Sequence, residues 1–63
     1  MKTEFRKIYK HLEVGGETHE VGDNVLTLPE LNTETEVAVG TDLGVFMIDL
    51  SYFKNDLLDN YIF

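Results

Sequence analysis

The chain has 63 residues, no cysteine and a formal net charge of −7 from 12 acidic and 5 basic side chains. Its length allows one small domain, residues 1–63, with a marginal core, and the lack of cysteine excludes disulfides and thiolate zinc sites. No apolar run approaches the ~18 residues of a membrane-spanning helix, and no apolar signal segment follows the N-terminal charges. We therefore expect a soluble, cytoplasmic protein.

The first turn signal along the chain is Gly15-Gly16, a pair that supplies the positive φ angles of a two-residue hairpin turn. It predicts a strand over residues 6–14 that pairs with a strand over residues 17–21. In that register Leu12 lies opposite His19 and His11 opposite Glu20.

The segment before this turn also has a helical pattern. Phe5, Ile8, Tyr9 and Leu12 recur at the spacing of an amphipathic helix. The turn chemistry favours a strand and the periodicity favours a helix, so the sequence leaves residues 5–12 open between the two.

Three further strands are expected, over residues 25–28, 36–39 and 45–48. Turns at residues 22–24 and 40–44 separate strands, and Pro29 ends the first because it cannot donate to a ladder. Residues 45–48 are a nearly continuous apolar run, which predicts the central, most buried strand. From Leu50 the apolar period becomes three and four, which predicts a short C-terminal helix capped by Asp49 or Ser51.

These elements predict a mainly β (α+β) fold: a small bent antiparallel sheet or SH3-like barrel with a short C-terminal helix. Residues 16–25, GETHEVGDNV, resemble the G-x-x-Y-x-x-G-D-x-V entrance of small SH3-like β-barrels, with His19 near the common aromatic position. The resemblance covers about ten residues and implies a turn followed by a strand.

Charge distribution is the main functional signal. Eleven of the twelve carboxylates follow residue 10, whereas four of the five basic side chains precede residue 11. Such an acidic surface attracts basic partners and opposes nucleic-acid phosphates and anionic lipid. We expect partner binding through the carboxylates of Glu30, Glu34, Glu36, Asp42, Asp49, Asp56 and Asp59.

Glu34 and Glu36 are the most suggestive of these residues. Two strand residues of one face lie about 6.7 Å apart, and DNA presents phosphate charges at comparably close intervals. A row of such carboxylates would imitate a phosphate track, and the alternative is an ordinary solvated strand face. In size and charge the chain resembles small phage-encoded host-takeover inhibitors that imitate DNA.

That resemblance implies a non-enzymatic DNA mimic that occupies the nucleic-acid-binding surface of a basic host protein. The alternative is a small structural or accessory module, such as a phage assembly component. No catalytic motif is present, and His11, His19 and Glu20 do not form a persuasive metal site, so we expect no enzyme, metal or cofactor. The apolar run Tyr61, Ile62 and Phe63 predicts the interface of a homodimer.

Overall fold

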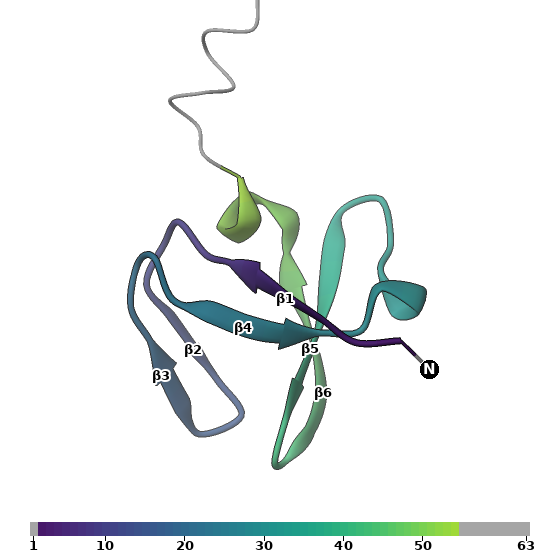
Figure 1. The fold of residues 1–63 in the computed structure, drawn as a ribbon, viewed down its shortest axis with the longest axis horizontal. Coiled ribbons are helices and arrows are strands. Elements are labelled where there is room, and N and C mark those ends of the chain that lie inside the picture. The colour runs from purple at the N-terminus through teal and green to yellow at the C-terminus, as the bar shows by residue number, and fades with distance from the viewer. Residues whose placement is uncertain (1, 55–63) are drawn as a thin grey trace, which may run out of the picture.

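The computed structural model describes residues 2–54, which form six strands and two short 3-10 helices. The elements in chain order are β1 (Glu4–Lys7), β2 (Leu12–Val14), β3 (Glu17–His19), β4 (Asn24–Thr27), η1 (Pro29–Leu31), β5 (Glu36–Thr41), β6 (Gly44–Asp49) and η2 (Leu50–Phe53). Four strands form an antiparallel sheet in the order β1-β4-β5-β6, and β2 pairs with β3 separately (Figure 1). The mainly β prediction is confirmed, although the sheets of the described part do not close into a barrel.

The two N-terminal strand pairs belong to one bent ribbon. Leu12 pairs with His19 and Val14 with Glu17, as the Gly15-Gly16 turn predicts. The pairing of β1 with β4 continues the same register, because its residues are also placed symmetrically about this turn, for example Arg6 opposite Val25. Gly15 and Gly16 have φ angles of 55° and 78°, which only glycine adopts without strain. One turn therefore sets the register of both strand pairs.

Residues 5–12 are not helical, so the strand interpretation is confirmed and the helical one is wrong. The predicted continuous strand is interrupted, however, between β1 and β2. Ile8 is fully buried and exchanges backbone hydrogen bonds with the turn at Gly22 and Asp23, whereas the N–H of Tyr9 donates to the carbonyl of Tyr52 in η2. The bend lets β2 and β3 fold over the core instead of extending the sheet.

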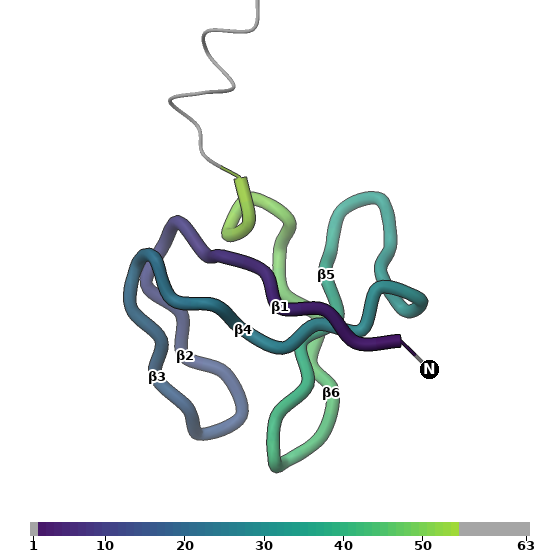
Figure 2. The backbone as a smooth tube through the Cα atoms, in the orientation of Figure 1, coloured from purple at the N-terminus to yellow at the C-terminus, as the bar shows by residue number. Residues whose placement is uncertain are grey.

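The core lies between the β2–β3 hairpin and the inner face of the four-stranded sheet. Its buried members are apolar and come from β2, β4, β5, η2 and the β1–β2 bend: Ile8, Leu12, Val14, Val25, Val37, Val39 and Phe53. The sheet turns sharply between β4 and β5, so that β1 and β4 run across β5 and β6 (Figure 2). Thr27, opposite Val39 at this crossing, is the one buried polar residue in the described part, and its hydroxyl donates to the carbonyl of Glu4 at 2.7 Å.

The prediction that residues 45–48 form the central buried strand is wrong. β5 is an interior strand, with Val37, Ala38 and Val39 all buried, and β6 is an edge strand. The side chains of Leu26 and Leu28 pack over Gly40 of β5, 3.5 Å from the position that a Cβ would occupy there. The apolar run of β6 is consequently the part of the sheet that faces outward.

The C-terminal helix prediction falls mostly outside the described residues. Within them, the chain after β6 makes a single 3-10 turn, η2 (Leu50–Phe53), whose buried residue is Phe53. A carboxylate oxygen of Asp49 accepts a 2.8 Å hydrogen bond from the N–H of Ser51 and so caps this 3-10 turn, whereas the predicted helix that it would cap is not shown. No helix in residues 2–54 has the length and apolar character needed to cross a membrane.

Candidate acidic binding site

A tight turn before β5 positions the first carboxylate of the candidate site. The hydroxyl of Thr33 accepts hydrogen bonds from the N–H groups of Thr35 and Glu36, at 3.3 and 3.0 Å, and the N–H of Thr33 donates to the carbonyl of Glu36. Threonine hydroxyls commonly stabilise such turns by bonding backbone groups two or three residues on. The turn fixes Glu34 at the entrance of β5, with an exposed side chain.

The end of β6 supplies the other acidic member. Asp49 lies directly opposite Glu36 in the β5–β6 register, and the N–H of Leu50 donates to the carbonyl of Thr35 at 2.8 Å. Residues opposite each other in an antiparallel pair have Cβ atoms about 4.5–5.5 Å apart. Glu36 and Asp49 are therefore cross-strand neighbours at the level of their Cβ atoms, and Glu34 belongs to the adjoining turn. We call Glu34, Glu36 and Asp49 the acidic corner.

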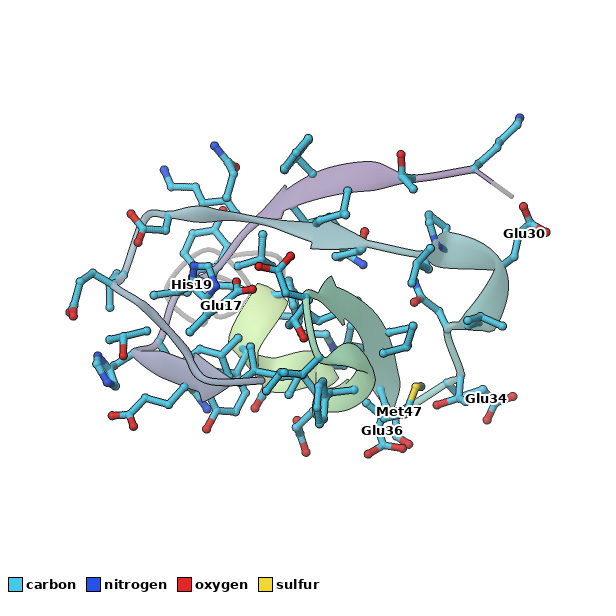
Figure 3. The ribbon with its side chains drawn as sticks, turned by 90° about the horizontal axis from the view of Figure 1, so that it is seen from below. Glu17, His19, Glu30, Glu34, Glu36 and Met47 are labelled. Atoms are coloured by element: carbon cyan, nitrogen blue, oxygen red, sulfur yellow. The ribbon has the colours of Figure 1, made fainter. Side chains whose placement is uncertain are left out.

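An open hollow of about 280 Å³ lies at the acidic corner. Its lining consists of Glu34, Thr35, Asp49, Leu50, Ser51 and Lys54. Glu34 and Glu36 project from the same corner of the molecule, beside Met47 (Figure 3). Within residues 2–54 no lysine or arginine nitrogen lies within 4.0 Å of a carboxylate oxygen, so the acidic corner is not neutralised by ion pairs of that part.

Asp49 has the most distinct electrostatic environment of the acidic corner. The hydrogen bond from the backbone N–H of Ser51 holds the pKa of its carboxyl below the usual range, and the Ser51 hydroxyl and the charges of Lys10 and Lys54 act in the same direction. Lys10 also bonds the Ser51 hydroxyl, with Nζ 3.1 Å from Oγ. Asp49 is thus anionic at neutral pH, and the two lysines partly offset the negative field.

The other predicted carboxylates lie away from this corner. Glu30 belongs to η1 and accepts a hydrogen bond from the backbone N–H of Lys2, and it points away from Glu34 and Glu36 (Figure 3). Asp42 lies in the turn at the opposite end of β5 and β6. Asp56 and Asp59 fall outside the described residues, as do Tyr61, Ile62 and Phe63.

The expectation that Glu34 and Glu36 alternate along one strand face is wrong. β5 begins at Glu36, so Glu34 belongs to the Thr33 turn and not to a strand. The neighbour that faces Glu36 in the sheet is Asp49, which comes from β6. The sequence offered one signal for this pairing, the turn predicted at residues 40–44, but the strands extend into it as far as Thr41 and Gly44, and that closing pair sets the register.

The histidines form contacts with carboxylates on the β2–β3 hairpin. Imidazole nitrogens of His11 lie 3.0 Å from a carboxylate oxygen of Glu13 and 3.3 Å from one of Glu20, and His19 lies 3.1 Å from Glu17. The predicted proximity of His11 and Glu20 is therefore present. No group of three or more potential metal ligands in the described part of the chain is arranged to hold an ion.

The basic side chains gather on aromatic rings, a feature that sequence reasoning missed. Arg6 lies over the ring of Phe53, Lys7 over that of Tyr9, and Lys10 over that of Tyr52, at 5.2 to 5.8 Å from the centroids. Such contacts contribute modestly at exposed sites. They keep three cations near the junction of β1, the β1–β2 bend and η2, and leave the far end of β5 and β6 without them.

Comparisons with protein families, curated proteins and solved structures find no match for this chain.

Proposed function

We propose that the chain is a non-enzymatic acidic binding protein that occupies the nucleic-acid-binding surface of a basic protein, as a DNA mimic does. The partner would be a host nucleic-acid-binding protein if the chain is phage-encoded, and binding would take place in the cytoplasm of that host. The chain itself would not bind nucleic acid, because its net charge of −7 opposes phosphate.

One observation carries this proposal: Glu36 and Asp49 are directly opposite each other in the β5–β6 register, with Glu34 on the adjoining turn. Like charges placed opposite each other destabilise a sheet. An arginine or lysine of a partner would relieve that repulsion on entering the hollow beside them. Nucleic-acid-binding grooves carry such side chains to bind phosphates, so the acidic corner would compete with DNA for them.

The five candidate carboxylates within residues 2–54 do not form the single row that would imitate a phosphate track. Glu30 and Asp42 lie apart from the acidic corner, and Lys10 and Lys54 lie close to Asp49. We therefore restrict the mimicry to the acidic corner, which would replace one or two phosphates of a bound duplex. Charge complementarity of this kind contributes to association rate and specificity as well as to affinity.

The test starts with capture of partners from a bacterial lysate on the immobilised chain, at ~50 mM and ~500 mM salt, because screening weakens charge attraction. A captured basic protein is then purified and mixed with labelled duplex DNA and increasing amounts of the chain. We expect the DNA to be displaced. A ternary complex of partner, DNA and chain would overturn the proposal, as would a partner whose binding does not respond to salt.

Matched variants locate the site. Glu34→Gln with Glu36→Gln removes two charges from the acidic corner, and Glu13→Gln with Glu17→Gln removes two from the β2–β3 hairpin. We expect the double variant at Glu34 and Glu36 to weaken partner binding about tenfold, and the double variant at Glu13 and Glu17 to weaken it less than about threefold. The reason is that a close charge pair contributes more binding energy than a distant charge, whose attraction is screened by salt. Equal losses would show that net charge, and not the acidic corner, determines binding.

A small structural or accessory module, such as a phage assembly component, is the second candidate function. The exposed apolar edge strand β6 favours it, because assembly proteins associate through such surfaces. Binding that persists at high salt would support this candidate. For the architecture we propose the finer form as well, a small bent antiparallel sheet of SH3-like type followed by a short C-terminal helix.

A further inference from the structure

In the described part of the chain, β6 is an edge strand with an apolar, exposed surface. β6 pairs with β5 on one side, and no strand within residues 2–54 pairs with its other side. Three consecutive apolar residues on it are exposed: Val45 by 49%, Phe46 by 38% and Met47 by 39%. An unpaired edge with apolar side chains on both faces is a template for the addition of another strand.

The hydrogen-bonding groups on this edge follow from the β5–β6 register. Thr41 and Gly44 flank the two-residue turn and form its closing pair, and the N–H of Leu50 donates to the carbonyl of Thr35. Hydrogen-bonded and non-bonded pairs alternate along an antiparallel ladder. The backbone groups of Phe46 and Ile48 therefore face β5, and those of Val45 and Met47 face the free edge.

The two edges of the sheet differ in protection. β1, at the other edge, has charged side chains at Glu4, Arg6 and Lys7, and charged edge residues oppose strand addition. β6 carries no charge from Gly44 to Ile48. Carboxylates flank this neutral stretch instead, with Asp42 at the turn end and the acidic corner at the other end.

We propose that the free edge of β6 binds an extended segment of the basic partner as an added β-strand. The segment alternates apolar residues over about five positions and carries lysine or arginine at both ends, where Asp42 and the acidic corner receive them. This inference rests on the proposed function and specifies the part of the partner that is recognised. Backbone hydrogen bonds supply affinity, and the charges at the two ends set register and selectivity.

A second copy of the chain is the competing occupant, and charge opposes it. Symmetric pairing of two β6 edges is antiparallel, so the Asp42 end of one copy would lie beside the acidic corner of the other. Each copy also carries a net charge of −7. A segment with cations at both ends is instead attracted to this edge, by Asp42 at one end and by the acidic corner at the other.

The probe is a peptide of alternating Thr and Val over five residues, with two Arg at each end, added to the isotope-labelled chain up to ~1 mM, a range that detects weak binding. Amide NMR shifts are expected to be largest at Val45, Met47 and Asp49. A second peptide has the same charges, but N-methyl groups replace the hydrogens of alternate backbone amides. These are the amides on the edge of the peptide that would pair with β6. We expect it to bind at least about tenfold more weakly, because each lost hydrogen bond reduces affinity.

Met47→Pro tests the edge from the side of the chain. Proline is tolerated where the N–H faces outward on an edge strand, so this substitution removes an outward donor and leaves the β5–β6 ladder intact. Met47→Ala is the matched control, because it shortens the side chain and keeps the N–H. We expect peptide binding to fall about tenfold in Met47→Pro and by less than about threefold in Met47→Ala. If the Met47→Pro variant does not fold, the N-methylated peptide still tests whether backbone hydrogen bonds at the β6 edge contribute to binding.

Three results would overturn the inference. Equal binding of the two peptides would mean that charge alone is recognised, and absence of binding by both would mean that the edge accepts no strand. Shifts at Val45 and Met47 that grow with the concentration of the chain alone would assign the edge to a second copy. The proposed function is judged separately by displacement of DNA from a captured partner, so failure of either is distinguishable from failure of the other.

Discussion

His11 lies between two carboxylates on the β2–β3 hairpin and is exposed to solvent. The hydrogen bond with Glu13, followed by that with Glu20, raises the pKa of its imidazole above the ordinary value of about 6.5. A raised pKa in the folded state means that folding stabilises the protonated form. This contribution to stability is fully present below the unfolded pKa and is lost as the pH rises through the folded pKa.

Glu13→Gln should lower the pKa of His11 toward its ordinary value, because it removes the nearer carboxylate. NMR titration of the imidazole protons measures it directly. Glu17→Gln is the control, since Glu17 contacts His19 and not His11. A His11 pKa at or below 6.5 in the unsubstituted chain would contradict the contacts with Glu13 and Glu20.

Gly15 is the residue on which the register of the bent ribbon depends most. It has a φ of 55°, and a Cβ at this position would overlap the side chain of Thr41, 2.8 Å from its Cβ. We expect Gly15→Ala to destabilise the chain by about 2–4 kcal/mol, from the left-handed conformation and the overlap together. Gly16→Ala meets only an ordinary 3.7 Å contact with Leu43 and should cost about 1–2 kcal/mol. Urea denaturation measures the difference, and equal losses would show that the Thr41 contact does not matter.

At the scale of elements, the turns were predictable and the order of strands in the sheet was not. Gly15-Gly16 predicted the pairing of Leu12 with His19, and Pro29 correctly ended β4. Hydropathy placed the buried strand at residues 45–48 because it counts apolar residues and ignores the space around them. Burial depends on the order of the strands in the sheet, which places β5 between β4 and β6 and leaves β6 at an edge, and no local pattern reveals that order.

The reversal of burial between β5 and β6 has a direct test. Val39→Ala in β5 should cost about 2 kcal/mol, because the side chain is 1% exposed and its removal leaves a cavity. Val45→Ala in β6 makes the same chemical change at an exposed position and should cost less than about 0.5 kcal/mol. Denaturant midpoints of the two variants give the comparison. A larger loss for Val45→Ala would restore β6 as the buried strand.

The acidic corner was predictable only in part, for a similar reason. Sequence spacing selected Glu34 and Glu36, yet the pair that the sheet brings together is Glu36 and Asp49. Contacts between strands depend on register, whereas sequence spacing reports neighbours along one strand. The Thr33 turn, which sets Glu34 beside that pair, depends on side-chain hydrogen bonds that no periodicity shows.

On the scale of the whole molecule, we expect the acidic corner to lower the stability of the fold and to raise its affinity for a basic partner. Glu36→Thr removes one of two opposed carboxylates and places a residue of high strand propensity in β5. We expect the melting temperature to rise and affinity for a captured basic partner to fall. Calorimetry and a binding titration of the same variant measure the two effects. A loss of stability would mean that Glu36 has a stabilising role, which would remove the main argument for a functional site there.

Net charge also separates self-association from partner binding. Two copies that each carry −7 repel each other, so added salt should strengthen the homodimer predicted from Tyr61, Ile62 and Phe63, whereas it should weaken binding to a basic partner. Sedimentation equilibrium at tens of micromolar, at ~50 and ~500 mM salt, measures the first effect. Deleting residues 61–63 should shift the chain toward monomer, and Met47→Pro should leave its association unchanged. A monomer at both salt concentrations would exclude the dimer. If Met47→Pro made the chain monomeric and deletion of residues 61–63 did not, the dimer interface would be the edge of β6 and not Tyr61, Ile62 and Phe63.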